Sequence, residues 1–426
     1  MTGDARSAGE ALQGTQLNIA RDQATQNIVH DGDLTVYQGG PPGYRVDEFP
    51  LTAPSVPVGV GRQPSRLLAA RYQVVDFTGR DTELAQLADW RDDPGLGLAV
   101  RLVHGPGGQG KTRLATVFAQ RCAARGWVVA RAVHRSYDTA PGAGIDAGRV
   151  AAAQGLLVIV DYAERWPVED LLALAQDRLL RSGVPTRVLL LARPAGLWWD
   201  NLSYRLSERW DTPADAMVLT TLADTVAERA AVFVAARDRF AELLDVPDPH
   251  RITPPLEALD ADAFGLVLTV HMAALVAVDA HTRGQAPPLD PAALSAYLLQ
   301  RERDHWASMH DTKRVHTRPE VMARAVFTAT LTRPLPYPEG VAALQQIGIP
   351  TPQQVLDDHR VCYPPADPAS VCEPLYPDRL AEDFLALHTP GHTRTDYQPD
   401  PWATTAPAQL LAPDSKGQSP AWAPRR

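Results

Sequence analysis

The stretch HGPGGQGKTRLA, residues 104–115, has the residue types and spacing of a phosphate-binding loop. Gly105, Gly110, Lys111 and Thr112 fit the pattern G-x-x-x-x-G-K-[ST]. In such a loop, backbone N–H groups surround phosphate oxygens, the lysine reaches the β- and γ-phosphates, and the hydroxyl ligates Mg²⁺. A Gly-rich turn of another kind would explain the glycines but not the Lys-Thr pair. We expect these residues to bind the nucleotide: Gly105, Pro106, Gly107, Gly108, Gln109, Gly110, Lys111, Thr112 and Arg113.

An acidic residue follows one of the most apolar runs of the chain. Residues 156–160 are all aliphatic, as expected of a strand buried on both faces, and Asp161 comes next. We expect Asp161 to hold Mg²⁺ through water, together with the Thr112 hydroxyl. Glu164 is a candidate for polarising the attacking water. The alternatives are a helix N-cap for Asp161 and a solvated loop residue for Glu164.

An arginine ends a third strand-like run, TRVLLLAR, at Arg193. A guanidinium at the carboxyl edge of a strand beside the phosphate site can sense the γ-phosphate. The alternative is an ion pair with a nearby acid. We therefore predict four catalytic residues: Lys111, Asp161, Glu164 and Arg193.

Strand-like apolar runs alternate along the chain with segments whose apolar residues have helical spacing, and these elements must position the candidate residues. Helix-like spacing follows the loop, with apolar side chains at Leu114, Phe118 and Cys122. This alternation predicts an α/β fold, a mostly parallel P-loop NTPase sheet with helices on both faces and the ligand at the strands' carboxyl ends. The expected strands are residues 96–105, 126–133, 155–160, 186–192 and 216–222.

Four segments in this order resemble bacterial STAND NTPases, the signalling ATPases related to NACHT and NB-ARC proteins. They are FTGRDTEL, HGPGGQGKTRLA, LLVIVDYAER and VLLLARPAGLWW. The resemblance covers residues 74–225 well and the helical region to about residue 390 loosely. It implies ATP as the nucleotide, with Gly79 and Arg80 near adenine and Arg193 as the γ-phosphate sensor. It also implies a helical lid, a winged-helix-like domain, and ATP-for-ADP exchange that opens the protein and allows self-association.

The chain departs from that family at three positions. Val267 stands where relatives carry a lid proline that contacts adenine, and Tyr162 stands where many have a second acid. The second departure predicts slow hydrolysis, or hydrolysis that depends on Glu164. His310 lies in SMHD, which resembles a family motif, but the polar surroundings favour a solvated side chain.

Composition shifts divide the chain into six expected regions. No repeat with a period of 34 or 40 residues is visible, so the sensor array that is common in the resembled family is absent, lies outside this sequence, or sits on another chain. The regions are a β-prone leader (1–40), a Pro-rich linker (41–72), the P-loop NTPase core (73–225), a helical lid (226–310), a winged-helix-like or helical domain (311–392) and a disordered tail (393–426).

The leader contains a weak internal echo, TQLNIARD followed by TQNIVHDGD. Short β-compatible segments separated by Asp and Gly could stack as a cross-β unit. The leader resembles the amyloid-type signalling motifs of some microbial STAND proteins, which would nucleate an effector with a matching copy. The alternatives are a disordered leader and a simple hairpin.

Bulk composition limits the function classes. The net charge of −9 argues against a broad nucleic-acid-binding face. Cys122, Cys362 and Cys372 form no metal-like pattern, which favours packing thiols in a reducing cytoplasm. The start of the chain has no apolar signal segment, and the run 264–278 is too short to span a membrane.

Two functional classes fit these observations. One is a nucleotide-gated signalling switch with slow ATP hydrolysis, in which ATP promotes self-association. The other is a turnover enzyme, either an AAA-like remodelling ATPase, with Arg165 or Arg205 as a trans-acting finger, or a small-molecule kinase. A transcription regulator is a weaker alternative. The leader and Tyr162 favour the switch.

Overall fold

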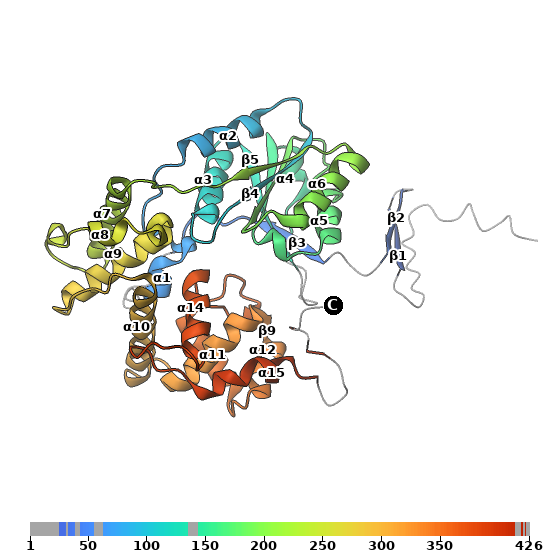
Figure 1. Cartoon of the computed structure of the whole chain (residues 1–426). Coiled ribbons are helices and arrows are strands. Elements are labelled where there is room, and N and C mark those ends of the chain that lie inside the picture. The colour runs from blue at the N-terminus through green and yellow to red at the C-terminus, as the bar shows by residue number, and fades with distance from the viewer. Residues whose placement is uncertain are drawn as a thin grey trace, which may run out of the picture.

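The structure is a computed structural model that describes residues 43–54, 63–134, 144–413, 419, 420 and 422, together with the backbone of residues 25–30 and 33–38. Figure 1 shows three described parts: an α/β core, a group of helices beside it, and a helical C-terminal region below. Within the described part of the chain, no helix combines the length and apolar character needed to cross a membrane.

A six-stranded sheet forms the centre of the core. Its inner strands β6 and β7 are buried at every position, because their residues are almost all aliphatic. All strands are parallel except the first edge strand, which is antiparallel to its neighbour. The order across the sheet is β3 (Tyr44–Glu48), β5 (Trp127–His134), β6 (Gly155–Val160), β7 (Thr186–Ala192), β4 (Leu98–His104) and β8 (Ala214–Val218).

Helices cover both faces of this sheet, as the alternating pattern predicts. One face packs on α2 (Asp81–Asp92) and α3 (Lys111–Ala123). The opposite face packs on α4 (Ala147–Ala151), α5 (Val168–Ala175) and α6 (Gly196–Trp210). The predicted α/β fold, with a mostly parallel sheet between two helical layers, is confirmed.

Four helices follow the core in the region where a lid is expected; we call them the lid, and their action as a lid stays a prediction. A capping box between Thr225 and Glu228 begins the first of them, and the Asp290 side chain caps the last. They are α7 (Val226–Leu243), α8 (Leu256–Leu259), α9 (Val267–Thr282) and α10 (Pro291–Asp311). Two short 3₁₀ turns, at Pro249–Arg251 and Asp262–Gly265, lie between them.

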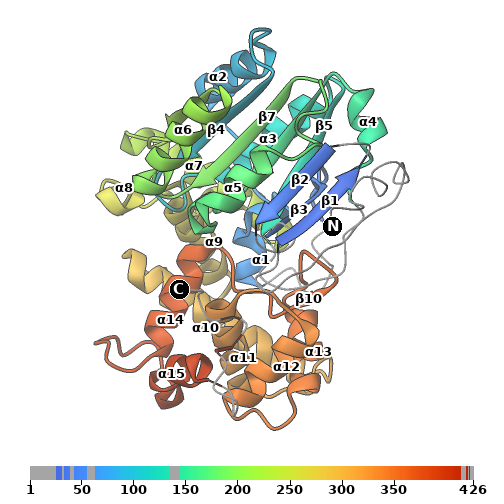
Figure 2. The same cartoon turned by 90° about the vertical axis from the view of Figure 1, so that its right-hand side faces the viewer.

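The C-terminal region has the element order of a winged helix: helix, strand, two helices and a strand, with the two strands antiparallel. A further helix, α14, follows and lies on the side facing the core, which Figure 2 also shows. The elements are α11 (Pro319–Thr332), β9 (Leu335–Pro336), α12 (Tyr337–Gln346), α13 (Pro352–Cys362), β10 (Ser370–Val371) and α14 (Asp378–His388).

Two regions differ from expectation. The linker 41–72 contains β3, α1 (Pro64–Leu68) and a 3₁₀ turn (Ala70–Tyr72), because Tyr44 and Leu67 find places in the cores. The tail 393–426 contains a 3₁₀ turn (Pro401–Thr404) and α15 (Ala406–Leu411). Its small and aliphatic side chains Ala403, Ala406 and Leu410 are buried, so this part is ordered despite its Pro/Ala-rich composition.

The leader forms an antiparallel hairpin of β1 (Thr25–His30) and β2 (Asp33–Gln38), with Thr25 opposite Gln38. This is the simple-hairpin alternative, with hydrogen bonds between strands of one chain. The first copy of the echo, TQLNIARD, lies outside the described residues. Cross-β assembly therefore stays a prediction.

A buried histidine makes the stability of the C-terminal region pH-dependent. His359 on α13 is 1% exposed, neither ring nitrogen has a partner among the described residues, and the ring stacks 5.0 Å from that of Tyr363. Burial lowers the pKa of His359 from 6.5 to about 4. The unfolded chain therefore binds more protons between these values, and stability falls as the pH drops from about 6.5 towards 4.

We expect His359→Phe, which keeps the stacking, to reduce the pH dependence of the unfolding free energy in that window by up to about one proton. Urea denaturation at several pH values measures this slope. The exposed His250→Phe is the control and should keep the wild-type slope. An unchanged slope in His359→Phe would contradict the assignment.

Candidate nucleotide-binding site

The predicted loop lies between the carboxyl end of β4 and the first residue of α3. Gly110 has φ 88° as the N-cap of α3, and Gly108 has φ 85°, a left-handed region that favours glycine. A Cβ on Gly108 would lie 3.0 Å from the Cβ of Leu268, so the lid packs directly on the loop. The Leu268 N–H also donates to the Gly108 carbonyl at 3.2 Å.

Lys111 points back into its own loop. Its Nζ donates to the carbonyls of Gly105, at 2.7 Å, and Pro106, at 2.9 Å. Burial lowers the pKa of the Lys111 ammonium; the nearby Asp161 carboxylate opposes this shift, and the Arg193 charge adds to it. Within the described part of the chain, the ammonium hydrogen-bonds only to neutral carbonyls, and this fits an anionic ligand because phosphate oxygens would be stronger partners.

Thr112 and Asp161 meet as the sequence predicts. The Thr112 hydroxyl donates to Asp161 Oδ2 at 3.0 Å, and Asp161 Oδ1 accepts from the Tyr162 N–H. Burial raises the pKa of Asp161 to about 6, and the carboxylates of Asp378 and Glu164 contribute to this rise. The Thr112 hydroxyl and the Asp161 carboxylate fit Mg²⁺, which prefers oxygen ligands and usually keeps several waters and substrate phosphates in its coordination shell.

Glu164 also lies at this site. Its Oε2 is buried and has no hydrogen-bond partner among the described residues. An unpaired carboxylate oxygen in a polar cavity fits the predicted role of orienting a water.

Arg193 lies over the loop but is bound by acids from α14. A Cβ on Gly107 would be 3.4 Å from its Cζ. Its guanidinium donates to Asp378, at 2.9 Å, and to Glu382. The Nη2 of Arg165 is 3.6 Å from the same Asp378 carboxylate. We call these four residues the core–α14 contact. Arg193 thus forms ion pairs with nearby acids, the alternative that the sequence leaves open for it. Its role as a γ-phosphate sensor stays a prediction.

The Gly79–Arg80 turn supports the loop from outside the cavity. Arg80, with φ 64°, is the N-cap of α2 and is buried. Its guanidinium donates to the carbonyls of Thr220, at 2.7 Å, and Gln109, at 3.4 Å, and to Glu83. Neither Gly79 nor Arg80 is among the residues that line the cavity, so an adenine contact there stays a prediction.

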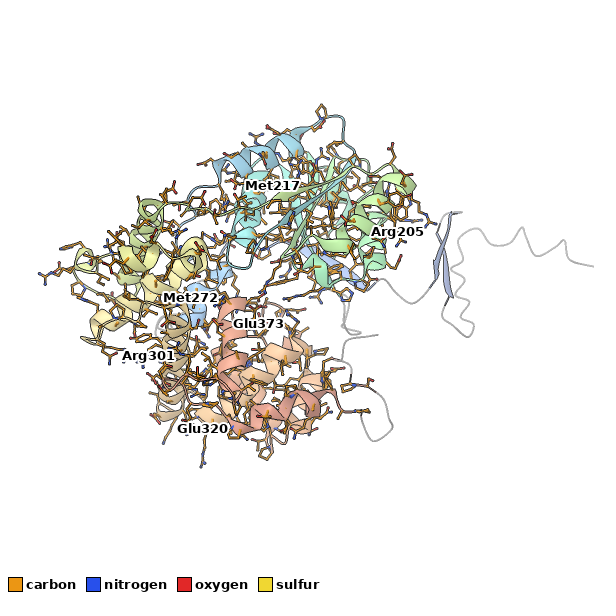
Figure 3. The ribbon with its side chains drawn as sticks, viewed as in Figure 1. Arg205, Met217, Met272, Arg301, Glu320 and Glu373 are labelled. Carbon is orange, nitrogen blue, oxygen red and sulfur yellow. The ribbon has the colours of Figure 1, made fainter. Side chains whose placement is uncertain are left out.

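A cavity of about 510 Å³ joins the predicted residues. One part of its lining comes from Asp161, Glu164, Arg193 and the predicted loop, of which Gly105 and Gln109 do not line the cavity. Two segments complete it that the sequence did not suggest, residues 67–75 and residues 373–382. The first turn of α9 also lines it, including Val267, the position where the resemblance implies a lid contact with adenine. Figure 3 labels Glu373 where the C-terminal region approaches the core. The acids of α14 were visible in sequence only as part of a helix, with no sign of their partner.

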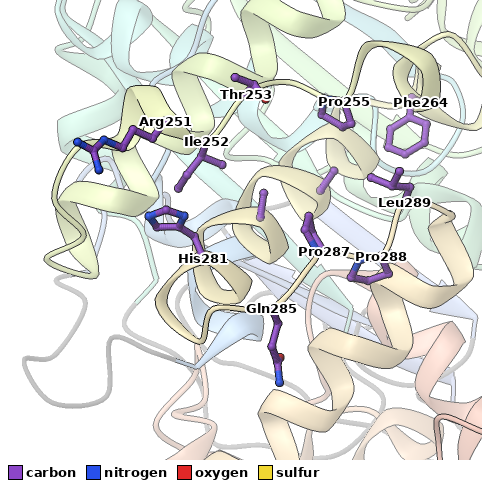
Figure 4. A pocket seen from close by; sticks show the side chains of 12 residues that line it. Arg251, Ile252, Thr253, Pro255, Phe264, His281, Gln285, Pro287, Pro288 and Leu289 are labelled. Carbon is purple, nitrogen blue, oxygen red and sulfur yellow. The ribbon is translucent and has the colours of Figure 1, made fainter.

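A second cavity, of about 210 Å³, lies within the lid. Figure 4 shows Arg251 and His281 on one side of it, and Pro288, Leu289 and Phe264 on the other. It contains none of the predicted site residues.

The strand order and the site together define a P-loop NTPase fold. The loop follows β4, which lies between β8 and β7, and Asp161 and Arg193 follow the next two strands, β6 and β7. The phosphate-binding loop, the acid and the arginine thus meet at one edge of a parallel sheet, where this fold binds its ligand.

The sequence matches no protein-family model and no curated protein. Among solved structures, it is similar to the Aeropyrum pernix ORC2 protein in ADPNP and ADP complexes, at 15% identity and TM-score 0.34, over 83% of this chain and 94% of that chain. It is also similar to a Thermotoga maritima RuvB variant, at 18% identity and TM-score 0.33, over 70% and 91%. Brucella abortus NtrX with ATP gives 14% identity and TM-score 0.34, over 56% and 63%. At these TM-scores the similarities carry no argument about function.

Proposed function

We propose that the chain is an ATP-dependent signalling switch of the STAND type, in which ATP and ADP select between two arrangements of the C-terminal region. The observation that carries this proposal is the core–α14 contact. The arginine that can sense a γ-phosphate is held by Asp378 and Glu382, two carboxylates from another part of the chain.

The γ-phosphate and these carboxylates compete for one guanidinium. All are anions, and Arg193 cannot pair fully with both sets at once. Asp161 interacts electrostatically with both Lys111 and Asp378, and Lys111 also interacts with Asp378, so an added phosphate beside Lys111 increases the negative charge near α14. ATP should therefore displace α14, whereas ADP, which lacks the γ-phosphate, should allow the contact.

Tyr162 connects the acid after β6 to the same contact. Its ring has the Arg165 guanidinium 4.0 Å from its centre and the Arg333 guanidinium, from the end of α11, at 5.9 Å. The residue in the position of a second acid thus packs between arginines of the core and the C-terminal region. This supports slow hydrolysis and a structural role for Tyr162.

The site residues have simple roles in this scheme. Lys111 would exchange the loop carbonyls for phosphate oxygens, and Thr112 and Asp161 would hold Mg²⁺. When bound, Mg²⁺ supplies charge neutralisation on the β- and γ-phosphates. Glu164 would orient the attacking water, so that hydrolysis resets the switch. Self-association in ATP, an effector or sensor on another chain, and a role in defence or cell-death signalling are supported by the STAND resemblance.

An AAA-like remodelling ATPase is the second candidate, since the same site would serve it. It needs an arginine from a neighbouring subunit. Arg165 approaches Asp378, and Arg205 pairs with Glu169 on the core surface, so both predicted fingers are engaged within the chain.

The two candidates differ in whether the bound nucleotide changes the oligomeric state of the protein. Size-exclusion chromatography with light scattering in ADP and in a non-hydrolysable ATP analogue tests the switch. We expect a monomer in ADP and a larger species in the analogue. An unchanged monomer in both, together with fast steady-state turnover, would contradict the proposal.

A further inference from the structure

Part of the nucleotide cavity is suited to a flat apolar group rather than to phosphate. It is formed by the segment before the core and the start of α9, whose lining side chains are mostly aliphatic, the exceptions being Arg71, Gln73 and His271. Such a surface favours the base of a nucleotide, because a charged phosphate would lose its hydration there. The aliphatic lining residues of these two segments are Leu67, Leu68, Ala69, Ala70, Val74, Val75, Leu266, Val267 and Leu268.

Arg113 brings a charged donor to this apolar surface. It lies on the first turn of α3, next to Thr112, and lines the cavity. Its Nη2 donates to the Val75 carbonyl at 3.0 Å. Its Nη1 is buried and has no hydrogen-bond partner among the described residues. The guanidinium is therefore held in place by one arm, and its other arm is unpaired.

The described titratable side chains near Arg113 do not accept a hydrogen bond from its Nη1. His271, from α9, lines the same cavity, and burial lowers the pKa of this imidazole to about 4, so it is neutral near pH 7. Asp76 interacts with Arg113 only through a coulombic attraction, without a hydrogen bond. A buried unpaired donor is rare in native structures, and a ligand is one of the partners that accounts for it.

We propose that Arg113 is a positioning residue for the nucleoside part of the bound nucleotide. Its Nη1 donates to an acceptor atom of the nucleoside while its Nη2 keeps the Val75 carbonyl. A guanidinium has donors only, so it needs an acceptor, and its planar fork can hold two acceptors at once. The inference rests on the proposed nucleotide binding. It adds which side chain binds the nucleoside, the part of the nucleotide that is remote from the γ-phosphate.

Binding of two ligands by Arg113→Leu separates this role from a phosphate contact. One ligand is a non-hydrolysable ATP analogue, measured by calorimetry, and the other is inorganic tripolyphosphate, measured by competition. We expect Arg113→Leu to lower the affinity for the ATP analogue by about 10- to 100-fold and the affinity for tripolyphosphate by less than about threefold. Arg113→Lys keeps the charge but not the fork, and should weaken the analogue by about three- to tenfold.

Arg239→Leu is the matched control. Arg239 Nε donates to the carbonyl of Val74, next to Val75, at 3.0 Å, but Arg239 does not line the cavity. It tests whether loosening this segment alone weakens binding, and we expect less than about threefold change for both ligands.

Five results would overturn the inference. Equal losses for both ligands in Arg113→Leu would make Arg113 a phosphate ligand. An unchanged affinity for the ATP analogue would make it structural, as would an equal loss in Arg239→Leu. If the wild type binds tripolyphosphate but not the ATP analogue, the nucleoside contact fails while the phosphate loop stands. If it binds neither, the proposed function fails as well.

Discussion

The double variant Asp378→Ala/Glu382→Ala is expected to release bound ADP about 5- to 150-fold faster than the wild type. Both carboxylates that hold Arg193 disappear, and Arg165 loses its acid. Burial and the nearby Arg165 lower the pKa of Arg333, and the Asp378 carboxylate opposes this. Without Asp378, the positive charges of Arg333 and Arg165 repel each other and lack the acid that attracts both. The arrangement in which α14 contacts the core should lose about 1–3 kcal/mol of stability, a range that allows for the partial exposure of these side chains.

Stopped-flow release of a fluorescent ADP analogue measures this rate. Glu169→Ala is the matched control, because it removes a comparable ion pair with Arg205 on α6, which Figure 3 shows away from the C-terminal region. We expect the control to release ADP at the wild-type rate. Equal rates in the double variant and the wild type would mean that α14 does not restrain the nucleotide.

Lys111→Ala is expected to weaken binding of ATP and ADP by at least about 100-fold. The variant removes the cation that the loop presents to the phosphates, in a partly buried site where charge-assisted hydrogen bonds are strong. Among the described residues, the ammonium hydrogen-bonds to the carbonyls of Gly105 and Pro106 and forms no ion pair. Its removal therefore breaks no direct salt bridge and costs only the longer-range attraction to acids such as Asp161 and Glu164.

Because of this, the fold should tolerate Lys111→Ala. Thermal unfolding of the nucleotide-free variant should occur within a few degrees of the wild type, while calorimetry detects no binding. Affinity within about threefold of the wild type would show that the loop does not bind phosphate.

Local patterns in the sequence predicted the central features of the fold. The strands β6 and β7 are aliphatic because both of their faces are buried, and that composition is visible without a structure. Thr112 and Asp161 were predicted to meet, since each follows a strand of one parallel sheet, and their oxygens lie 3.0 Å apart.

Features that depend on long-range packing could not be predicted in the same way. The strand β3 is five residues of mixed character, and only its pairing with β5 makes it part of the sheet. Asp378 is one of 50 acidic residues, and its sequence neighbours give no sign that it faces Arg193, 185 positions away. The Arg113 contact with Val75 likewise joins segments whose local patterns are unrelated.

The central claim is that a γ-phosphate separates α14 from the core. Spin labels at Glu208→Cys on α6 and Asp357→Cys on α13 measure this directly, since both positions are exposed and Cys122, Cys362 and Cys372 are buried. We predict one narrow distance distribution in ADP, and a longer, broader one in a non-hydrolysable ATP analogue. The same distribution in both nucleotides, at saturating concentrations, would contradict the switch.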